Sequence, residues 1–169
     1  MIASVSGPVG DIRLTLTPQL HPETASKLIA VDLSEGRDRL GGSILAQVVQ
    51  SFGDDCPDME DPEKLRAFVG VIRSLAAEGR ILAYHDRSDG GFAAAAAEMM
   101  FAGHCGLSFD VAPLLRGGDR SEESVLRTLF NEEAGALLQV REEDAEIAME
   151  RFRAAGLDHA AVFVGAPKN

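Results

Sequence analysis

Short β-prone runs alternate with helical segments along most of this chain, and this alternation limits the folds open to it more than any other feature. The β-prone runs lie at 27–33, 81–84, 107–111, 136–140 and 161–164, and turn residues separate them from helical patterns. Such alternation predicts an α/β (α+β) domain in which helices pack in layers against a mixed sheet. The order of the strands cannot be read from the pattern.

The clearest helical signal begins at Asp61-Pro62, because proline fits the first helical position, where its missing N–H needs no partner. From Leu65 to Ala76, apolar residues recur at i, i+3, i+4, i+7, i+10 and i+11, and Gly79 is placed to end the helix. Further helices are predicted at 44–51, where Ser43 is the cap, and at 91–102, 122–130 and 142–155.

The length of 169 residues suits one domain, since domains average roughly 150 residues. We expect a single domain over 1–169 with its core at about 20–165. The ends at 1–16 and 166–169 are expected to be extended or poorly ordered without contacts from elsewhere. We therefore expect a domain excised from a longer multidomain chain, with a naturally short protein as the alternative.

Charge and hydropathy exclude several classes of protein. The chain has 27 Asp and Glu against 16 Lys and Arg, a formal net charge of −11, which disfavours binding to nucleic acid. No apolar run approaches the ~18 residues of a membrane span, and the start lacks the pattern of a secretory signal. Cys56 and Cys105 lack the spacing of a zinc site, and a disulfide framework is not expected. We expect a cytoplasmic protein.

The segment His85–Gly91 (HDRSDGG) lies between a predicted strand and a predicted helix, where backbone N–H groups converge on anions. Asp86 and Asp89 offer the hard oxygen ligands that Mg²⁺ prefers, and the Ser88 hydroxyl can bind a phosphate. The alternative, that Ser88 or Asp89 only caps the helix, stays open. His85 suits a general base, or a packed imidazole at the end of a strand.

Two pairs of glycines are candidates for phosphate-binding loops. Gly90 and Gly91 have no Cβ, so they permit positive φ and a close approach of a ligand oxygen to the main chain. Gly41 and Gly42, in Leu40–Ser43, form a second glycine-rich connection of the same type. Neither segment is a P-loop or a Rossmann fingerprint. Two such loops in one small domain favour a phosphorylated ligand.

Three segments carry a resemblance to a known family: His85–Gly91, Phe101–Gly106 (FAGHCG) and Leu129–Gly135 (LFNEEAG). Together they resemble the large, single-chain form of phosphoribosylformylglycinamidine synthase. The chain looks like the second of that enzyme's two domains related to the C-terminal domain of aminoimidazole ribonucleotide synthetase. The similarity runs from about Gly7 to Gly165.

The resemblance implies an ATP- and Mg²⁺-dependent ligase of de novo purine biosynthesis. Such a glutamine amidotransferase uses ammonia from glutamine to convert formylglycinamide ribonucleotide to the amidine. In the family, Asp86 matches a magnesium-ligand position and Ser88 a nucleotide-contact position, while the Gly90-Gly91 turn faces phosphate-bearing ligands. The family has a catalytic ATP site and a structural ADP site, and we assign this loop to the structural one.

The resemblance also implies what this chain lacks. The partner domain, which supplies most nucleotide contacts, and the glutaminase domain are both outside it, so we assign no catalytic residue. We expect the chain to pack against other domains of the same protein and, in isolation, to form no amidine. The alternatives are a related enzyme, such as aminoimidazole ribonucleotide synthetase or selenophosphate synthetase, and a non-catalytic structural or interaction module. Solvent access to Asp86 and Ser88 separates a ligand-binding loop from a purely structural one.

Overall fold

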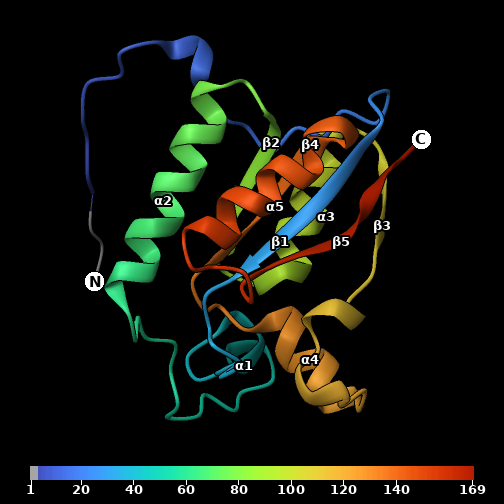
Figure 1. The fold of residues 1–169 in the computed structure, drawn as a ribbon. Helices are drawn as coiled ribbons and strands as arrows, with labels where there is room; N and C mark the ends of the chain where they lie inside the picture. Colours follow the sequence, from blue (N-terminus) through green and yellow to red (C-terminus); the bar gives the residue numbers. More distant parts are fainter. Residues whose placement is uncertain (1–3) are drawn as a thin grey trace.

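A five-stranded antiparallel sheet separates the helices into two layers in the computed structural model, which describes residues 4–169 (Figure 1). The strand order is β2-β4-β1-β5-β3. The first three residues of the predicted N-terminal segment lie outside the described residues. The strands are β1 (Ser26–Asp32), β2 (Ile81–Asp86), β3 (Gly106–Phe109), β4 (Gly135–Arg141) and β5 (Ala161–Lys168), and the helices are α1 (Ile44–Val48), α2 (Pro62–Ala77), α3 (Gly91–Gly103), α4 (Glu122–Phe130) and α5 (Ala145–Ala154).

The predicted layered α/β class is confirmed, but the sheet is antiparallel at each described pairing where a mixed sheet was expected. The reason lies in the crossovers. Helix α5 connects β4 to β5, and these two strands run in the same direction, as in a parallel unit. They are not neighbours, however, because β1 lies between them and runs the opposite way. In the same manner β4 lies between β1 and β2. Each of these helical crossovers therefore leaves one strand position open between the strands that it connects, and a strand of opposite direction occupies that position.

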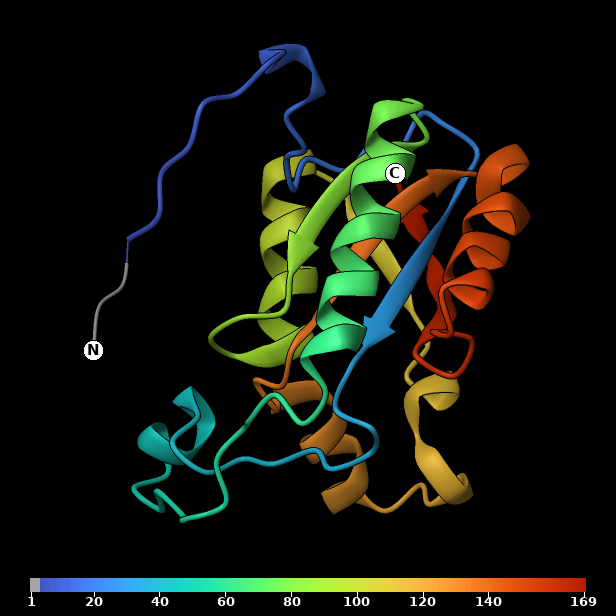
Figure 2. The ribbon, with the colours of Figure 1, turned by 60° about the vertical axis from the view of Figure 1, so that its left-hand side comes forward.

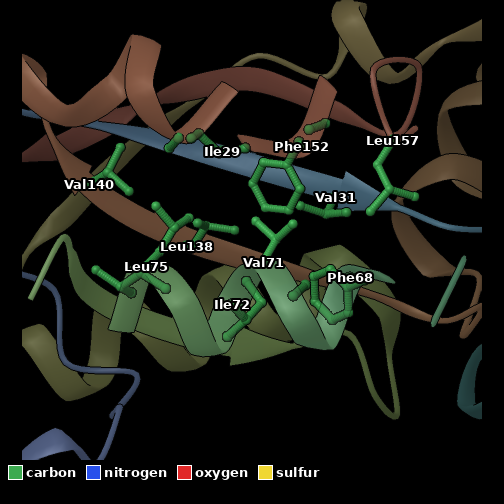
Figure 3. Packing of buried hydrophobic residues seen from close by; sticks show 14 of the residues in the cluster. Ile29, Val31, Phe68, Val71, Ile72, Leu75, Leu138, Val140, Phe152 and Leu157 are labelled. Atoms are coloured by element: carbon green, nitrogen blue, oxygen red, sulfur yellow. The ribbon is translucent and has the colours of Figure 1, made fainter. Parts of the chain in front are cut away.

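The two faces of the sheet are both apolar because side chains alternate along each strand. In β1, Ile29 and Val31 face α2 and α5, whereas Leu28 and Ala30 face α3. Figure 3 shows the first of these cores, to which α5 contributes Phe152 and α2 contributes Val71 and Leu75. The result is a sandwich with α2 and α5 on one face and α3 on the other (Figure 1).

Helix α2 begins at Pro62 as predicted, and Oδ1 of its cap Asp61 accepts a hydrogen bond from Glu63 N at 3.0 Å. The buried stripe is narrower than the apolar pattern suggested. Leu65 and Val69 belong to that pattern, yet they are 37% and 44% exposed on the outer side of the helix. The residues that reach the core are Phe68, Val71, Ile72 and Leu75.

The last predicted strand is longer than expected. It was predicted to end at 164, but β5 continues to Lys168, because β3 lies beside it and pairs Gly106 with Lys168. The predicted helix over 142–155 is divided into a short 3₁₀ turn at 142–144 and α5. At the opposite edge, Tyr84 N of β2 donates to Thr17 O at 2.8 Å, so the N-terminal segment covers that edge.

Long connections gather where β1 and β2 end and β4 begins. The register places Asp32 opposite Gly135 and Asp86 opposite Ala136. We call the segments 32–61, 86–91 and 116–134 the loop end; it lies below the sheet and includes α1 and α4 (Figure 2). Among residues 4–169, no helix is both long enough and apolar enough to cross a membrane.

Candidate functional site

The polar residues of the HDRSDGG segment emerge at the loop end. Asp86 is the last residue of β2, and Asp86, Ser88 and Asp89 are all exposed. The side chains of Asp86 and Ser88 make no hydrogen bond or ion pair with another described residue. They therefore face solvent and are not covered by the domain's own helices, which is the arrangement that a ligand-binding loop requires.

Gly91 has to be glycine because the main chain of the connection between α4 and β4 lies against it. Its φ is +67°, and a Cβ would lie 2.5 Å from Leu129 O and 2.7 Å from Asn131 O. Those contacts are too close for a side chain, so the absence of a Cβ at Gly91 serves packing between two parts of the chain. Its N–H donates to Ser88 O at 2.9 Å and closes the turn.

The second glycine-rich loop is closed in a similar way. A Cβ on Gly41 would lie 2.5 Å from Asp55 O, and Gly41 N donates to that oxygen at 2.9 Å. Gly42 N donates to Phe52 O at 2.8 Å. Ser43 caps α1 as predicted, since its Oγ accepts from Ala46 N at 3.2 Å.

The carboxylate of Glu132 brings the two loops together. Its Oε1 accepts one hydrogen bond from Gly90 N and another from Ile44 N, each at 2.8 Å. Backbone N–H groups at the starts of α3 and α1 thus converge on a negative charge that the protein itself supplies. With these bonds, the N–H groups of Gly41, Gly42, Gly90 and Gly91 all donate to protein acceptors.

Below this bridge, Arg87 anchors the first loop to the sheet. Its Nη2 donates to Asp32 Oδ1 at 2.7 Å, and the two side chains are 0% and 7% exposed. The same guanidinium donates to the main-chain oxygens of Glu133 at 2.6 Å and Ala134 at 3.0 Å. It also stacks 4.4 Å from the centroid of the Phe92 ring.

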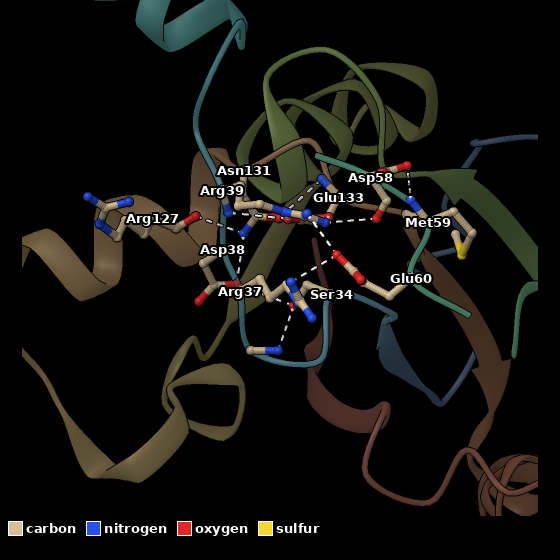
Figure 4. A network of polar contacts seen from close by, with 12 residues as sticks. Ser34, Arg37, Asp38, Arg39, Asp58, Met59, Glu60, Arg127, Asn131 and Glu133 are labelled. Atoms are coloured by element: carbon tan, nitrogen blue, oxygen red, sulfur yellow. Dashed lines mark hydrogen bonds and ion pairs between the residues drawn. The ribbon is translucent and has the colours of Figure 1, made fainter. Parts of the chain in front are cut away.

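A second buried ion pair anchors the other loop (Figure 4). Arg39 donates from Nε and Nη2 to the two carboxylate oxygens of Glu133, at 2.6 and 2.9 Å. Its remaining nitrogen, Nη1, donates to Glu60 at 3.0 Å. Beside this pair, Asn131 Nδ2 donates to Asp38 Oδ1 at 3.2 Å. The short run from Asn131 to Glu133 therefore holds both loops, and we call these three residues the hub.

Neighbouring groups keep the buried carboxyl of Asp32 ionised. Burial acts to raise the pKa of Asp32, but the charge of Arg87 and hydrogen bonds from Ser34 outweigh it, so that the pKa is lowered. The hydrogen bond to Glu133 raises the pKa of Arg39, which keeps the guanidinium charged. On the sheet side of the loop, burial together with the charge of Asp86 raises the pKa of Tyr84 to about 12, so its hydroxyl is neutral at pH 7.

Sequence reasoning assigned no role to Asp32, Arg39, Arg87, Glu132 or Glu133. One signal was present, because Asn131-Glu132-Glu133 lies inside one of the three segments that carried the family resemblance. Another was the charge of Asp32 at the end of an apolar strand, where an ionised side chain needs a partner. Neither signal named the partner.

His85 is arranged as a packed imidazole, one of the two interpretations that the sequence left open. Its Nδ1 lies 2.7 Å from Asp86 O, and its Nε2 lies 2.6 Å from Glu98 Oε2 on α3. Both ring nitrogens already have protein partners, so this side chain ties β2 to α3.

The donor set for a cation at this loop is small. Across residues 4–169, no group of three or more His, Cys, Asp or Glu side chains is arranged to hold a metal ion. Asp86 nevertheless offers an exposed carboxylate, and Mg²⁺ is commonly held by one or two carboxylates together with phosphate oxygens and waters. The residues present therefore fit part of a Mg-nucleotide site.

Comparison with known proteins identifies the fold family. The family model described as AIR synthase related protein, C-terminal domain, matches residues 26–166. This range includes the hub, the whole of β1 to β4, and β5 as far as Ala166.

Solved structures with this fold include nucleotide-bound enzymes. T. maritima PurL complexed with ATP is 14% identical, with a TM-score of 0.69, and the match covers 94% of this chain and 24% of that chain. T. maritima PurL complexed with FGAR is 16% identical, with a TM-score of 0.69, and the match covers 94% of this chain and 26% of that one. This chain thus spans about a quarter of the PurL chains that it matches.

A further structural match is a protein whose name describes a different role. E. coli HypE, a hydrogenase maturation protein, is 17% identical, with a TM-score of 0.57, and the match covers 92% of this chain and 47% of HypE. At such identities the likeness shows the fold. The fold alone therefore does not separate the synthase from its relatives.

Proposed function

The chain belongs to the family of AIR synthase related proteins, C-terminal domain, and from this premise we propose that it is one domain of a phosphoribosylformylglycinamidine synthase. This ligase of de novo purine biosynthesis is ATP-dependent and uses glutamine to convert formylglycinamide ribonucleotide to formylglycinamidine ribonucleotide. The fold of T. maritima PurL, solved with ATP and with FGAR, supports this assignment, as do the three sequence segments.

The observation that carries the proposal is the exposure of Asp86 and Ser88 on a loop whose backbone is held from below. The side chains of Asp86 and Ser88 face solvent. Arg87, which lies between them, is hydrogen-bonded to Asp32, and the nearby Gly90 is hydrogen-bonded to Glu132. A binding loop is most effective when its backbone is already in the bound geometry. Asp86 would ligate Mg²⁺ through a carboxylate oxygen, and the Ser88 hydroxyl would donate to a phosphate of ATP or ADP.

The glycines would contribute by lacking a side chain and not by donating hydrogen bonds to the ligand. Because the N–H groups of Gly41, Gly42, Gly90 and Gly91 already have protein acceptors, they would border the phosphate-binding surface without donating to it. Gly91 and Gly41 permit the close packing that places the two loops side by side. We assign this loop to the structural nucleotide site of the family.

This chain's own residues orient the ligand and do not perform bond-making steps. When bound, ATP would supply the phosphoryl group that activates the amide oxygen of the substrate. Glutamine would be used by other domains, against which this domain packs in the cytoplasm. Exposed apolar side chains at and after α1 support such packing; they are Ile44, Val48, Val49 and Phe52. We expect the isolated chain neither to form amidine nor to hydrolyse glutamine.

The second candidate function is a non-catalytic structural module, or a domain of a related enzyme such as aminoimidazole ribonucleotide synthetase. One observation favours the structural module, because the glycine N–H groups of both loops are satisfied internally. In that case Asp86 and Ser88 would be ordinary surface residues.

Equilibrium binding of ADP, measured with Mg²⁺ and with EDTA, separates these candidates. We expect Mg²⁺-dependent binding by the wild-type chain, at least tenfold weaker binding by Asp86→Asn and Ser88→Ala, and wild-type affinity for the control Glu150→Ala. Glu150 is exposed on α5, which packs on the opposite face of the sheet from α3. An Asp86→Asn variant that binds Mg-ADP like the wild type, or a wild-type chain that binds no nucleotide, would contradict the ligand-binding role given to Asp86 and Ser88.

A further inference from the structure

One carboxylate oxygen joins two loops that are distant in sequence. Glu132 Oε1 accepts from Gly90 N, 42 residues away, and from Ile44 N, 88 residues away, at 2.8 Å in both cases. Glu132 is half-buried, in contrast to its buried neighbours Asn131 and Glu133. We propose that Glu132 is a positioning residue that couples the two loops, so that a ligand contact at 86–91 changes the position of 40–44.

The two loops share a single acceptor atom on Glu132. Because the same oxygen receives both N–H groups, movement of either loop weakens a bond that also positions the other. Bonds from N–H groups to a carboxylate are charge-assisted and about twice as strong as neutral ones. Acceptors on two different side chains would let each loop move with its own acceptor, whereas a shared acceptor makes the two movements dependent on each other.

The loop that Glu132 holds is strained and needs such support. Within 33–61, the non-glycine residues Glu35, Asp38 and Gln50 all have positive φ, at 56°, 44° and 56°. A non-glycine residue held in this region is strained and persists only when surrounding contacts determine its conformation. The hub holds the segment 38–44 of this loop at both of its ends. Asn131 donates to Asp38, and Glu132 accepts from Ile44 N.

The coupling gives the apolar residues after Ile44 a function within the proposed enzyme, and this step rests on the proposed nucleotide site. Val48, Val49 and Phe52 are 75%, 59% and 61% exposed on the segment that Glu132 positions. A nucleotide bound through Asp86 and Ser88 that displaces the neighbouring Gly90 also shifts Glu132 and, with it, the start of α1. Occupancy of the nucleotide loop would then be communicated to the surface through which this domain contacts its neighbours.

Amide hydrogen exchange of the ¹⁵N-labelled chain tests the coupling without any ligand. We expect Glu132→Ala to accelerate exchange at both Gly90 and Ile44 by at least tenfold, and Glu150→Ala to leave both within twofold of the wild type. Glu132→Gln keeps one acceptor oxygen and should recover most of the protection at both amides, which a general loss of stability would not reproduce. Acceleration at only one of the amides, or equal acceleration across the sheet, would overturn the proposal.

A titration with Mg-ADP then tests the transmission. In the wild type we expect chemical shift changes at 86–91 and at 44–48; in Glu132→Ala those at 86–91 remain and those at 44–48 disappear. Shifts at 44–48 that persist in Glu132→Ala would overturn the coupling. If Mg-ADP shifts no resonance of the wild type, the proposed function fails, whereas the exchange experiment still decides whether Glu132 ties the loops. Circular dichroism of each variant verifies that the fold is retained.

Discussion

The sandwich and the loop end are built from different interactions. Between the sheet and its helices, most of the buried side chains are apolar, such as Phe152 and Leu75, both fully buried. At the loop end, four of the buried side chains are the ions of two pairs, Arg87 with Asp32 and Arg39 with Glu133. Apolar contacts accept many arrangements of similar volume, whereas a buried ion pair is satisfied only in one geometry. The loop end is therefore organised for definite placement of backbone and side chains.

The largest predicted loss of stability comes from breaking the Arg39–Glu133 ion pair at the loop end. Glu133→Ala leaves the Arg39 charge buried without its two carboxylate bonds, and such a loss costs about 3–5 kcal/mol of unfolding free energy. Urea unfolding of Glu133→Ala beside Glu150→Ala measures it, and the control should change by less than about 0.5 kcal/mol. A Glu133→Ala variant as stable as this control would show that the pair does not organise the loop end.

Acid should weaken the loop end through Asp32. Its pKa is lower in the folded chain than the ordinary value of about 3.9, so the unfolded state binds protons first as the pH falls. The stabilisation from Asp32 is complete above about pH 4 and is lost as the pH falls through the lowered pKa. Urea unfolding between pH 7 and pH 3 should show this decline, with a shallower decline in Asp32→Asn. Equal slopes for the two proteins would contradict the assignment to Asp32.

A smaller loss of stability is predicted when a buried apolar side chain of the sandwich is shortened. Ile29→Val removes one methylene from a fully buried site of β1 that faces α2 and α5, and it should cost about 0.5–1.5 kcal/mol. The ADP affinity should stay unchanged because the sandwich supports the site only as a scaffold. A loss of affinity comparable with that of Asp86→Asn would break the proposed separation between the two regions.

The smallest effect concerns the two thiols. Cys56 is exposed in the loop end, whereas burial, with a contribution from the charge of Glu23, raises the pKa of Cys105 beside β3. Since the thiolate is the reactive form, a thiol reagent at pH 7.5 should modify Cys56 several times faster than Cys105. Peptide mass spectrometry at timed intervals distinguishes them, and faster modification of Cys105 would show that its surroundings open.

The two regions also differ in how far the sequence predicts them. The spacing of apolar residues located α2, and β-prone runs bounded by turn residues located the five described strands, because both signals depend on residues close together in the sequence. The Ser43 cap followed from local preference. The Glu132 bridge and the two buried ion pairs did not follow, since they join residues that are 42 to 94 positions apart and no local pattern encodes their meeting.

The most direct test of the account is a ¹H–¹⁵N map of the wild-type chain during titration with Mg-ADP. The account predicts saturable shift changes concentrated at Asp86–Gly91 and extending to 44–48, with little change along α2 and α5. That result would identify the loop end as the nucleotide-binding region. Changes centred on the sandwich face of α2 and α5, or no change at saturating Mg-ADP, would contradict the claim that the exposed loop between β2 and α3 is a nucleotide site.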